Sequence, residues 1–150
     1  MSDLRDLYQQ VILDHQKKPR NFRVVEAADR DAEGFNPLCG DKIHLFVKME
    51  NGVIKEVGFQ GTGCAISTAS ASMMTESVKG KTPAEAEAIF KQFQNLVTSD
   101  AHEKVNAPEL GKLEVFSGVR EFPVRVKCAT LPWHTLRAAL KGEDKPVSTE

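Results

Sequence analysis

Residues 42–60, KIHLFVKMENGVIKEVGFQ, decide the fold. Apolar side chains alternate along the first half of this stretch: Ile43, Leu45, Val47 and Met49. Alternation with a period of two is typical of a strand that buries one face. Asn51-Gly52 is a strong signal for a two-residue hairpin turn, so residues 53–60 are predicted to form the returning strand.

Helices are predicted on both sides of this hairpin. On the C-terminal side, residues 64–79 are rich in Ala, Ser and Met and stop before a glycine, which indicates a helix. The sequence TPAE at 82–85 begins another helix, with a Thr cap, a Pro in the first position and a Glu three residues after the cap. On the N-terminal side, apolar residues at helical spacing run through residues 4–12 and stop before Pro19.

The last third of the chain is predicted to be helical with loops. Its predicted elements are, in order, a loop (99–111), a short helix (112–119), an extended segment (124–127) and a helix (128–140) with Pro132 in its first turn. Strands followed by helices predict an α+β protein, with a small antiparallel β-sheet packed on one face by helices. We expect a single domain over residues 1–141 and a flexible polar tail over 142–150.

Composition excludes several classes of function. The chain has 150 residues, of which 41% are hydrophobic and 27% are charged, and its net charge is −1. This balance predicts neither nucleic-acid binding nor attachment to an anionic membrane. The N-terminus lacks the apolar core of a signal peptide, so a cytoplasmic location is expected. Three cysteines cannot all pair within one chain, and in a reducing cytosol they are thiols or metal ligands.

The three cysteines occur at junctions between predicted elements. Cys39 lies in the turn NPLCGD (36–41), Cys64 follows Gly-Thr-Gly before a helix, and Cys128 begins the last predicted helix. A helix N-terminus favours a thiolate, which is the form of cysteine that binds metal. Asp41 is separated from Cys39 by a single glycine, which permits a tight turn that could aim both side chains at one point.

Three thiolates and one carboxylate would complete the tetrahedral coordination that zinc prefers. The spacing alone leaves other interpretations open, because scattered cysteines are also compatible with independent buried residues, and an aspartate in a turn with an Asx-turn. The four histidines are predicted to be surface or packing residues rather than metal ligands: His15, His44, His102 and His134.

Four longer motifs resemble a known family. NPLCGD (36–41), GTGCAIS (61–67) and PVRVKCATLPW (123–133) resemble the three cysteine motifs of the U-type iron–sulfur cluster assembly proteins, the IscU/NifU N-terminal type, and LYQQVILDHQKKPRN (7–21) resembles the N-terminal region of the same family. These motifs span most of the chain in the family's order. The resemblance implies an α+β fold and one metal site, carried onto Cys39, Asp41, Cys64 and Cys128.

Two departures favour one branch of that family. The scaffold branch, which is IscU-like, carries a histidine directly before the third cysteine, where this sequence has Lys127. The stretch between Cys64 and Cys128 is also longer than in that branch, and the predicted helix that begins at 82–85 fills it. Both features resemble the SufU-like branch. That resemblance implies tightly bound Zn²⁺ and the acceptance of sulfur from a cysteine desulfurase.

The implied function is therefore that of a zinc-dependent sulfurtransferase in iron–sulfur cluster biogenesis, with a SufS-like cysteine desulfurase as donor and downstream iron–sulfur assembly proteins as acceptors. Cys39 is expected to accept the sulfur by attack of its thiolate, because it lies in a turn rather than at a helix start. Arg125 is expected either to hydrogen-bond that thiolate or Asp41, or to be an exposed surface residue.

Two other functions remain open at this stage. The same ligands could hold iron in a [2Fe–2S] cluster, in which case the protein is a scaffold for cluster assembly. Alternatively, the zinc could be structural in a non-catalytic adaptor.

Overall fold

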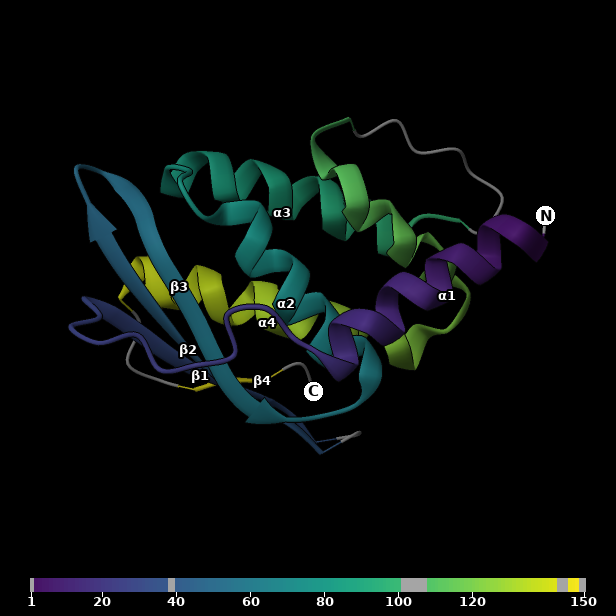
Figure 1. The fold of residues 1–150 in the computed structure, drawn as a ribbon, viewed down its shortest axis with the longest axis horizontal. Helices are drawn as coiled ribbons and strands as arrows, with labels where there is room; N and C mark the ends of the chain where they lie inside the picture. Colours follow the sequence, from purple (N-terminus) through teal and green to yellow (C-terminus); the bar gives the residue numbers. More distant parts are fainter. Residues whose placement is uncertain (1, 38–39, 101–107, 143–145, 149–150) are drawn as a thin grey trace.

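A computed structural model describes residues 2–37, 40–100, 108–142 and 146–148. Within these ranges it contains four strands, four α-helices and one segment of 3₁₀-helix, in the order α1, β1, β2, β3, α2, α3, η1, α4, β4 (Figure 1). The α+β class predicted from the sequence is confirmed, with helices packed on a four-stranded sheet.

The predicted hairpin forms the centre of the sheet. β2 (Asp41–Glu50) and β3 (Val53–Thr62) pair in antiparallel fashion. Asn51 and Gly52 have φ values of 54° and 80°, the left-handed conformation that a two-residue hairpin turn requires at both positions. Along β2, the buried side chains alternate with more exposed ones, as the sequence pattern predicts.

Two further strands complete the sheet in the order β3-β2-β1-β4. β1 (Arg30–Asn36) pairs antiparallel with β2, and the two-residue β4 (Val147–Ser148) pairs parallel with β1. The sequence analysis predicted neither strand. RDAEGFN lacks the β-branched residues that mark strands, and β4 falls within the segment expected as a polar tail.

Capping residues and helix-breaking residues mark the ends of the helices. α1 (Ser2–Lys17) ends just before Pro19, and α2 (Ala65–Val78) follows the Gly-rich end of β3. In α3 (Pro83–Thr98), the capping box is complete: Thr82 Oγ1 accepts a hydrogen bond from Glu85 N at 3.1 Å, and Thr82 N donates to Glu85 Oε1 at 3.0 Å.

The C-terminal helix differs from the prediction. η1 (Pro108–Glu121) is followed at once by α4 (Pro123–Lys141), so residues 124–127 are helical and not extended. The amides of Arg125 and Val126 already donate to Phe122 O, at 2.8 and 3.2 Å. Pro123, not Pro132, occupies the first position of the helix, and Pro132 lies inside it.

α4 runs behind the sheet and covers one face of it, while α1 lies beside α2 at the other end of the molecule (Figure 1). Gly34 of β1 allows this close packing, because a Cβ atom there would overlap Thr135 of α4. Trp133 is fully buried between the helices and stacks on Phe93 and Phe90. Helices and sheet thus share one apolar core.

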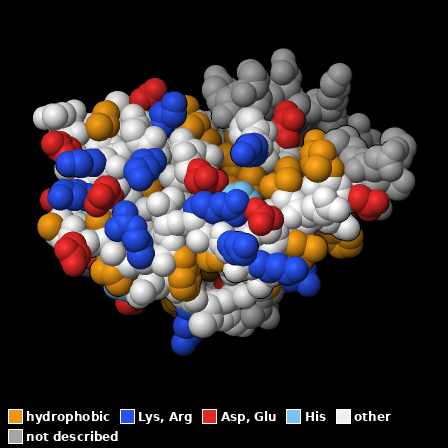
Figure 2. Space-filling model, viewed as in Figure 1, with side chains coloured by type: hydrophobic (Ala, Val, Ile, Leu, Met, Phe, Trp, Pro, Cys, Tyr) orange, Lys and Arg blue, Asp and Glu red, His pale blue; other side chains and the backbone are white. Residues whose placement is uncertain are grey.

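Within the described residues, no helix has the combination of length and apolar character that crossing a membrane requires. Figure 2 shows one face of the molecule, on which basic and acidic side chains are interspersed with small apolar patches.

Candidate metal centre

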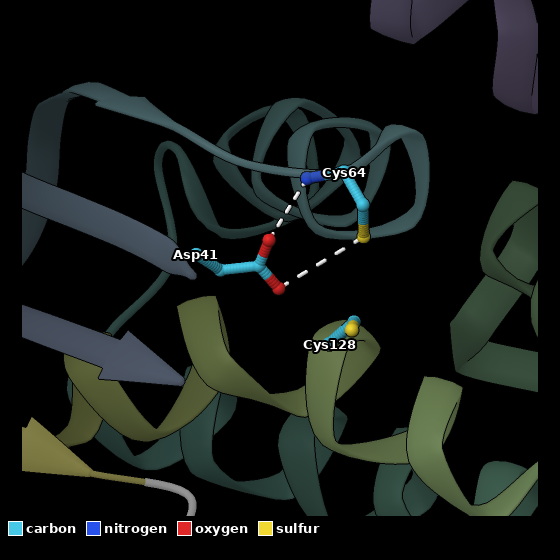
Figure 3. A group of neighbouring side chains, drawn as sticks. All are labelled: Asp41, Cys64 and Cys128. Atoms are coloured by element: carbon cyan, nitrogen blue, oxygen red, sulfur yellow. Dashed lines mark hydrogen bonds between the residues drawn. The ribbon is translucent and has the colours of Figure 1, made fainter. Parts of the chain in front are cut away.

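Asp41, Cys64 and Cys128 converge on one point of the structure (Figure 3). One ligand atom from each residue, a carboxylate oxygen and two sulfurs, lies within 4.8 Å of the other two. Among the described residues, no other group of three or more His, Cys, Asp or Glu side chains meets this criterion. The three residues belong to β2, to the start of α2 and to α4, which are far apart in the sequence.

Asp41 begins β2 and links the sheet to α2. Its side chain is 1% exposed, and its Oδ1 accepts a hydrogen bond from Cys64 N at 2.8 Å. Its Oδ2 lies 3.9 Å from Cys64 Sγ. One carboxylate oxygen therefore binds the start of α2, while the other faces the sulfur of Cys64. The side-chain hydrogen bond of Asp41 reaches Cys64 in another segment, so it does not support the Asx-turn alternative.

Cys64 is the N-cap residue of α2, as predicted, and is half-buried. Its backbone is extended, with φ −73° and ψ 170°, and its sulfur accepts a hydrogen bond from Ser67 N at 3.5 Å. A backbone N–H and the N-terminal end of α2 therefore both face this sulfur. The local fold thus presents a sulfur that is suited to bind a cation.

Gly63 makes the approach between Asp41 and α2 possible. A Cβ atom at this position would lie 2.4 Å from Ser67 Oγ and 2.9 Å from Asp41 Oδ1, closer than real Cβ contacts allow. In the sequence this glycine is visible only as part of the Gly-Thr-Gly that precedes Cys64, whereas the structure gives it a packing role beside the site.

Cys128 is fully buried and lies five residues after Pro123, in the second turn of α4. The prediction that it sits at a helix N-terminus is wrong, because the helix begins at Pro123. Its sulfur accepts a hydrogen bond from Asn36 Nδ2 at 3.6 Å, and it lies 3.7 Å from Val124 O. Asn36 was not among the predicted site residues, although it opens the NPLCGD motif.

The donor set fits a tetrahedral metal ion. Two ligands at about 2.3 Å from a tetrahedral centre are about 3.8 Å apart, so three donor atoms within 4.8 Å need only a small contraction to share one ion. Two soft sulfur donors and one carboxylate suit zinc, and sulfur donors also suit iron. Cys39, the predicted fourth ligand, lies outside the described residues.

Basic residues border the site without entering it. Lys42 follows Asp41 and is exposed, while Lys127 precedes Cys128 and is half-buried. Arg125 is exposed and lies three residues before Cys128 on α4. Residues three apart on a helix are neighbours on its surface, so α4 places Arg125 next to Cys128 along one side of the helix.

The histidines have other partners. His15 is buried, with its Nδ1 2.7 Å from Ser72 Oγ, and His44 lies on the exposed face of the sheet with its Nε2 2.7 Å from Asp31 Oδ2. The ring of His134 packs edge-on against Phe90. Burial lowers the pKa of both His15 and His134, and the neighbouring Arg20 and Arg137 respectively lower it further. His102 lies outside the described residues.

Comparison with known proteins agrees with this architecture. Residues 7–140 match the family model described as NifU-like N terminal domain. The chain is 39% identical over 146 residues to a Bacillus subtilis protein named zinc-dependent sulfurtransferase SufU, covering 95% of each chain. It is 41% identical over 141 residues to a Streptococcus pyogenes protein named iron–sulfur cluster assembly scaffold protein IscU, covering 94% of this chain and 87% of the relative.

A solved structure has the same fold. The crystal structure of a putative iron–sulfur cluster assembly scaffold protein for the SUF system, from Fervidobacterium islandicum, superposes with a TM-score of 0.80 at 37% identity. The match covers 87% of this chain and 94% of that one. On the match to the family model and the length and identity of these alignments, the chain belongs to the NifU-like N-terminal domain family.

Proposed function

We propose that this protein is a zinc-dependent sulfur acceptor in iron–sulfur cluster biogenesis, which takes sulfane sulfur from a cysteine desulfurase and passes it to cluster assembly. The observation that carries the proposal is the convergence of Asp41 with the sulfurs of Cys64 and Cys128. The Bacillus subtilis relative that is named a zinc-dependent sulfurtransferase supports the choice of metal and activity.

The residues proposed to hold the ion are Asp41, Cys64 and Cys128, with Cys39 as the fourth ligand. A bound zinc ion would keep cysteine sulfurs deprotonated at neutral pH. The protein contributes a buried carboxylate and two thiols that are already oriented by the backbone of α2 and by the amide of Asn36. A site formed in this way needs little rearrangement of these three side chains when the ion binds.

In the proposed transfer step, a cysteine thiolate of this chain attacks the outer sulfur of the persulfide on the desulfurase. A new S–S bond forms on the acceptor, the S–S bond of the donor breaks, and the donor cysteine leaves as a thiolate. Cys128 is fully buried, and Cys64 is half-buried and caps α2. Attack requires access to the partner's persulfide, so the proposal assigns the acceptor role to Cys39, which the sequence places two residues before Asp41.

Arg125 is proposed to assist the acceptor from the rim of the site. Its side chain is exposed and belongs to the first turn of α4, on the same side of the helix as Cys128. A guanidinium there could donate hydrogen bonds to an incoming persulfide or to the acceptor thiolate. An Arg125→Ala variant with unchanged stimulation of the desulfurase would reject this role.

A second function has specific support. The Streptococcus pyogenes relative is named a cluster assembly scaffold, and sulfur ligands also bind iron. The residue before Cys128 is a lysine rather than the histidine of the scaffold branch, which is why sulfur transfer is the first choice.

The deciding experiment is anaerobic purification, followed by measurement of zinc, iron and the rate of sulfide release from cysteine by a desulfurase. A colourless zinc protein that accelerates the desulfurase supports sulfur transfer. A coloured iron protein would establish the scaffold function instead. A zinc protein with no effect on the desulfurase would make the ion structural. Cys39→Ala should abolish the acceleration while leaving measurable zinc, and full acceleration by this variant would refute Cys39 as the acceptor.

A further inference from the structure

Asn36 is a polar side chain in a position where the fold otherwise places small residues. On β1 the side chains facing the helices alternate along Ala32, Gly34 and Asn36, and Asn36 is 0% exposed. The cost of burying an amide in a core is severe unless it is hydrogen-bonded. The buried amide of Asn36 therefore requires a hydrogen-bond partner.

The partner shown by the structure is a sulfur atom. Asn36 Nδ2 donates to Cys128 Sγ at 3.6 Å. The donor comes from the last residue of β1, whose register partner is Asp41, so Asn36 and Asp41 face the same side of the sheet. The backbone oxygen of Asn36 accepts from Gly40 N at 2.8 Å, which fixes both ends of the turn that carries Cys39. Asn36 thus lies between Cys128 of α4 and the start of β2.

The strength of this hydrogen bond depends on the state of the sulfur. A thiol is a weak acceptor, whereas a thiolate, free or bound to a cation, is a strong one. A hydrogen bond donated to a ligating sulfur withdraws electron density from it, which fixes its orientation and makes it a poorer nucleophile. The hydrogen bond from the buried amide of Asn36 would therefore become stronger when Cys128 binds a metal ion.

We propose that Asn36 is a positioning residue that holds Cys128 on the metal as the fixed, weakly nucleophilic ligand, so that incoming sulfur goes to another cysteine. This inference rests on the metal site proposed above. It gives a chemical reason why the cysteines differ. Cys128 is made less nucleophilic by burial and by a hydrogen bond from the sheet, whereas among the described residues the donor to the sulfur of Cys64 is the backbone amide of Ser67 in its own helix.

The proposal makes three separable predictions for Asn36→Leu, which keeps the side-chain volume similar but removes the donor. In the cobalt-substituted protein, the sulfur-to-metal charge-transfer band should move to lower energy, because the electrons of the sulfur are less stabilised. The dissociation constant for zinc should rise about ten- to hundred-fold, the effect typical of losing a hydrogen bond to a metal ligand. After incubation with desulfurase and cysteine, mass spectrometry should find more sulfane sulfur on the Cys128 peptide than in the wild type.

Thr135→Val is the matched control. Thr135 is also fully buried and lies on α4, and its Oγ1 donates to Leu131 O at 2.8 Å. Its loss removes one buried hydrogen bond from the same helix without touching a sulfur. This variant should keep the wild-type cobalt spectrum, zinc affinity and sulfur distribution. A shift as large in Thr135→Val as in Asn36→Leu would show a general packing effect and overturn the proposal.

The outcomes distinguish this inference from the proposed function. A wild-type protein that binds neither zinc nor cobalt would refute the metal site itself. A metal-binding wild type with an unchanged spectrum and affinity in Asn36→Leu would overturn only the role of Asn36.

A measurement on the wild type covers the case in which the variant does not fold. With an NMR-active cadmium isotope at the site, the side-chain amide protons of Asn36 should show scalar coupling to the metal through the hydrogen bond to sulfur. Absence of this coupling in the metal-loaded protein would also overturn the proposal.

Discussion

A substitution at Gly63 perturbs the site without replacing any of the proposed ligands. In Gly63→Ala, the added methyl group would lie 2.4 Å from Ser67 Oγ and 2.9 Å from Asp41 Oδ1, whereas ordinary van der Waals contacts begin at 3.4 Å. The serine hydroxyl must move by about 1 Å and the carboxylate by about 0.5 Å, which is the tolerance within which a metal site has to be held. Asp41 is 1% exposed and bonded to Cys64 N, so it has little space in which to adjust.

The expected magnitude follows from these distances. A displacement of this size should weaken zinc binding about ten- to hundred-fold, or about 1.4–2.7 kcal/mol. Overpacking should also destabilise the fold by about 1–3 kcal/mol. Part of this loss is offset, because replacing Gly by Ala restricts the unfolded chain and so stabilises the fold by about 0.4–1 kcal/mol. For a chain of this length, a net loss near 1 kcal/mol lowers Tm by about 2–4 °C.

The assay is competition for zinc against a chromophoric chelator, alongside thermal unfolding. Gly118→Ala is the matched control, because a Cβ atom there meets nothing within 4 Å. It should retain wild-type zinc affinity and unfold at the same or a slightly higher temperature. If Gly63→Ala binds zinc as tightly as Gly118→Ala does, Asp41 is not a ligand held in place by this close approach, and the reasoning fails.

Three further predictions concern the fold. Burial lowers the pKa of His15 and His134 below 6.5, so between about pH 7 and 5 the unfolded chain binds protons that the native state does not. The free energy of unfolding should therefore fall as the pH is lowered through this range. The decrease should be at most about 1.4 kcal/mol per pH unit for each histidine. Urea titrations across this range test it, and a flat profile would contradict it. Thr82→Ala should cost about 1 kcal/mol in thermal unfolding, because it removes the cap of α3, and an unchanged unfolding temperature would contradict the capping role. Phe93→Ala should cost about 3–5 kcal/mol in urea unfolding, because the ring is fully buried against Trp133, and a loss below 1 kcal/mol would mean that the core collapses around the space.

Local signals in the sequence predicted the parts of the fold that local chemistry determines. Asn51-Gly52 requires left-handed backbone, and the structure has it at both residues. The capping box at Thr82 depends on residues only three apart, and it forms as predicted. The helix start after Cys64 was also visible, because a Gly-rich strand end precedes it. Each of these features depends on residues within about four positions of one another in the sequence.

The errors arose where long-range packing decides the structure. β1 is a strand because β2 pairs with it and because its small buried residues let α4 approach, and neither cause is visible in RDAEGFN. At α4, the helix was expected to begin at Cys128 with Pro132 in its first turn, and the residues before Cys128 were expected to be extended. The hydrogen bonds to Phe122 O show that the helix begins at Pro123. The cysteine motifs pointed to the site, but the donor from Asn36 depends on how β1 meets α4, so it required coordinates.

The three described donors come from the start of β2, the cap of α2 and the second turn of α4. No short piece of this chain contains more than one of them, so the binding free energy of an ion at this site is available only to the assembled fold. Metal occupancy would therefore report on folding: a chain in which α4 has come away from the sheet would lose the Cys128 sulfur as a donor and hold the ion more weakly. Release of the ion should then accompany the cooperative unfolding transition, and the ion should raise the unfolding temperature in proportion to the logarithm of its free concentration once that concentration exceeds the dissociation constant.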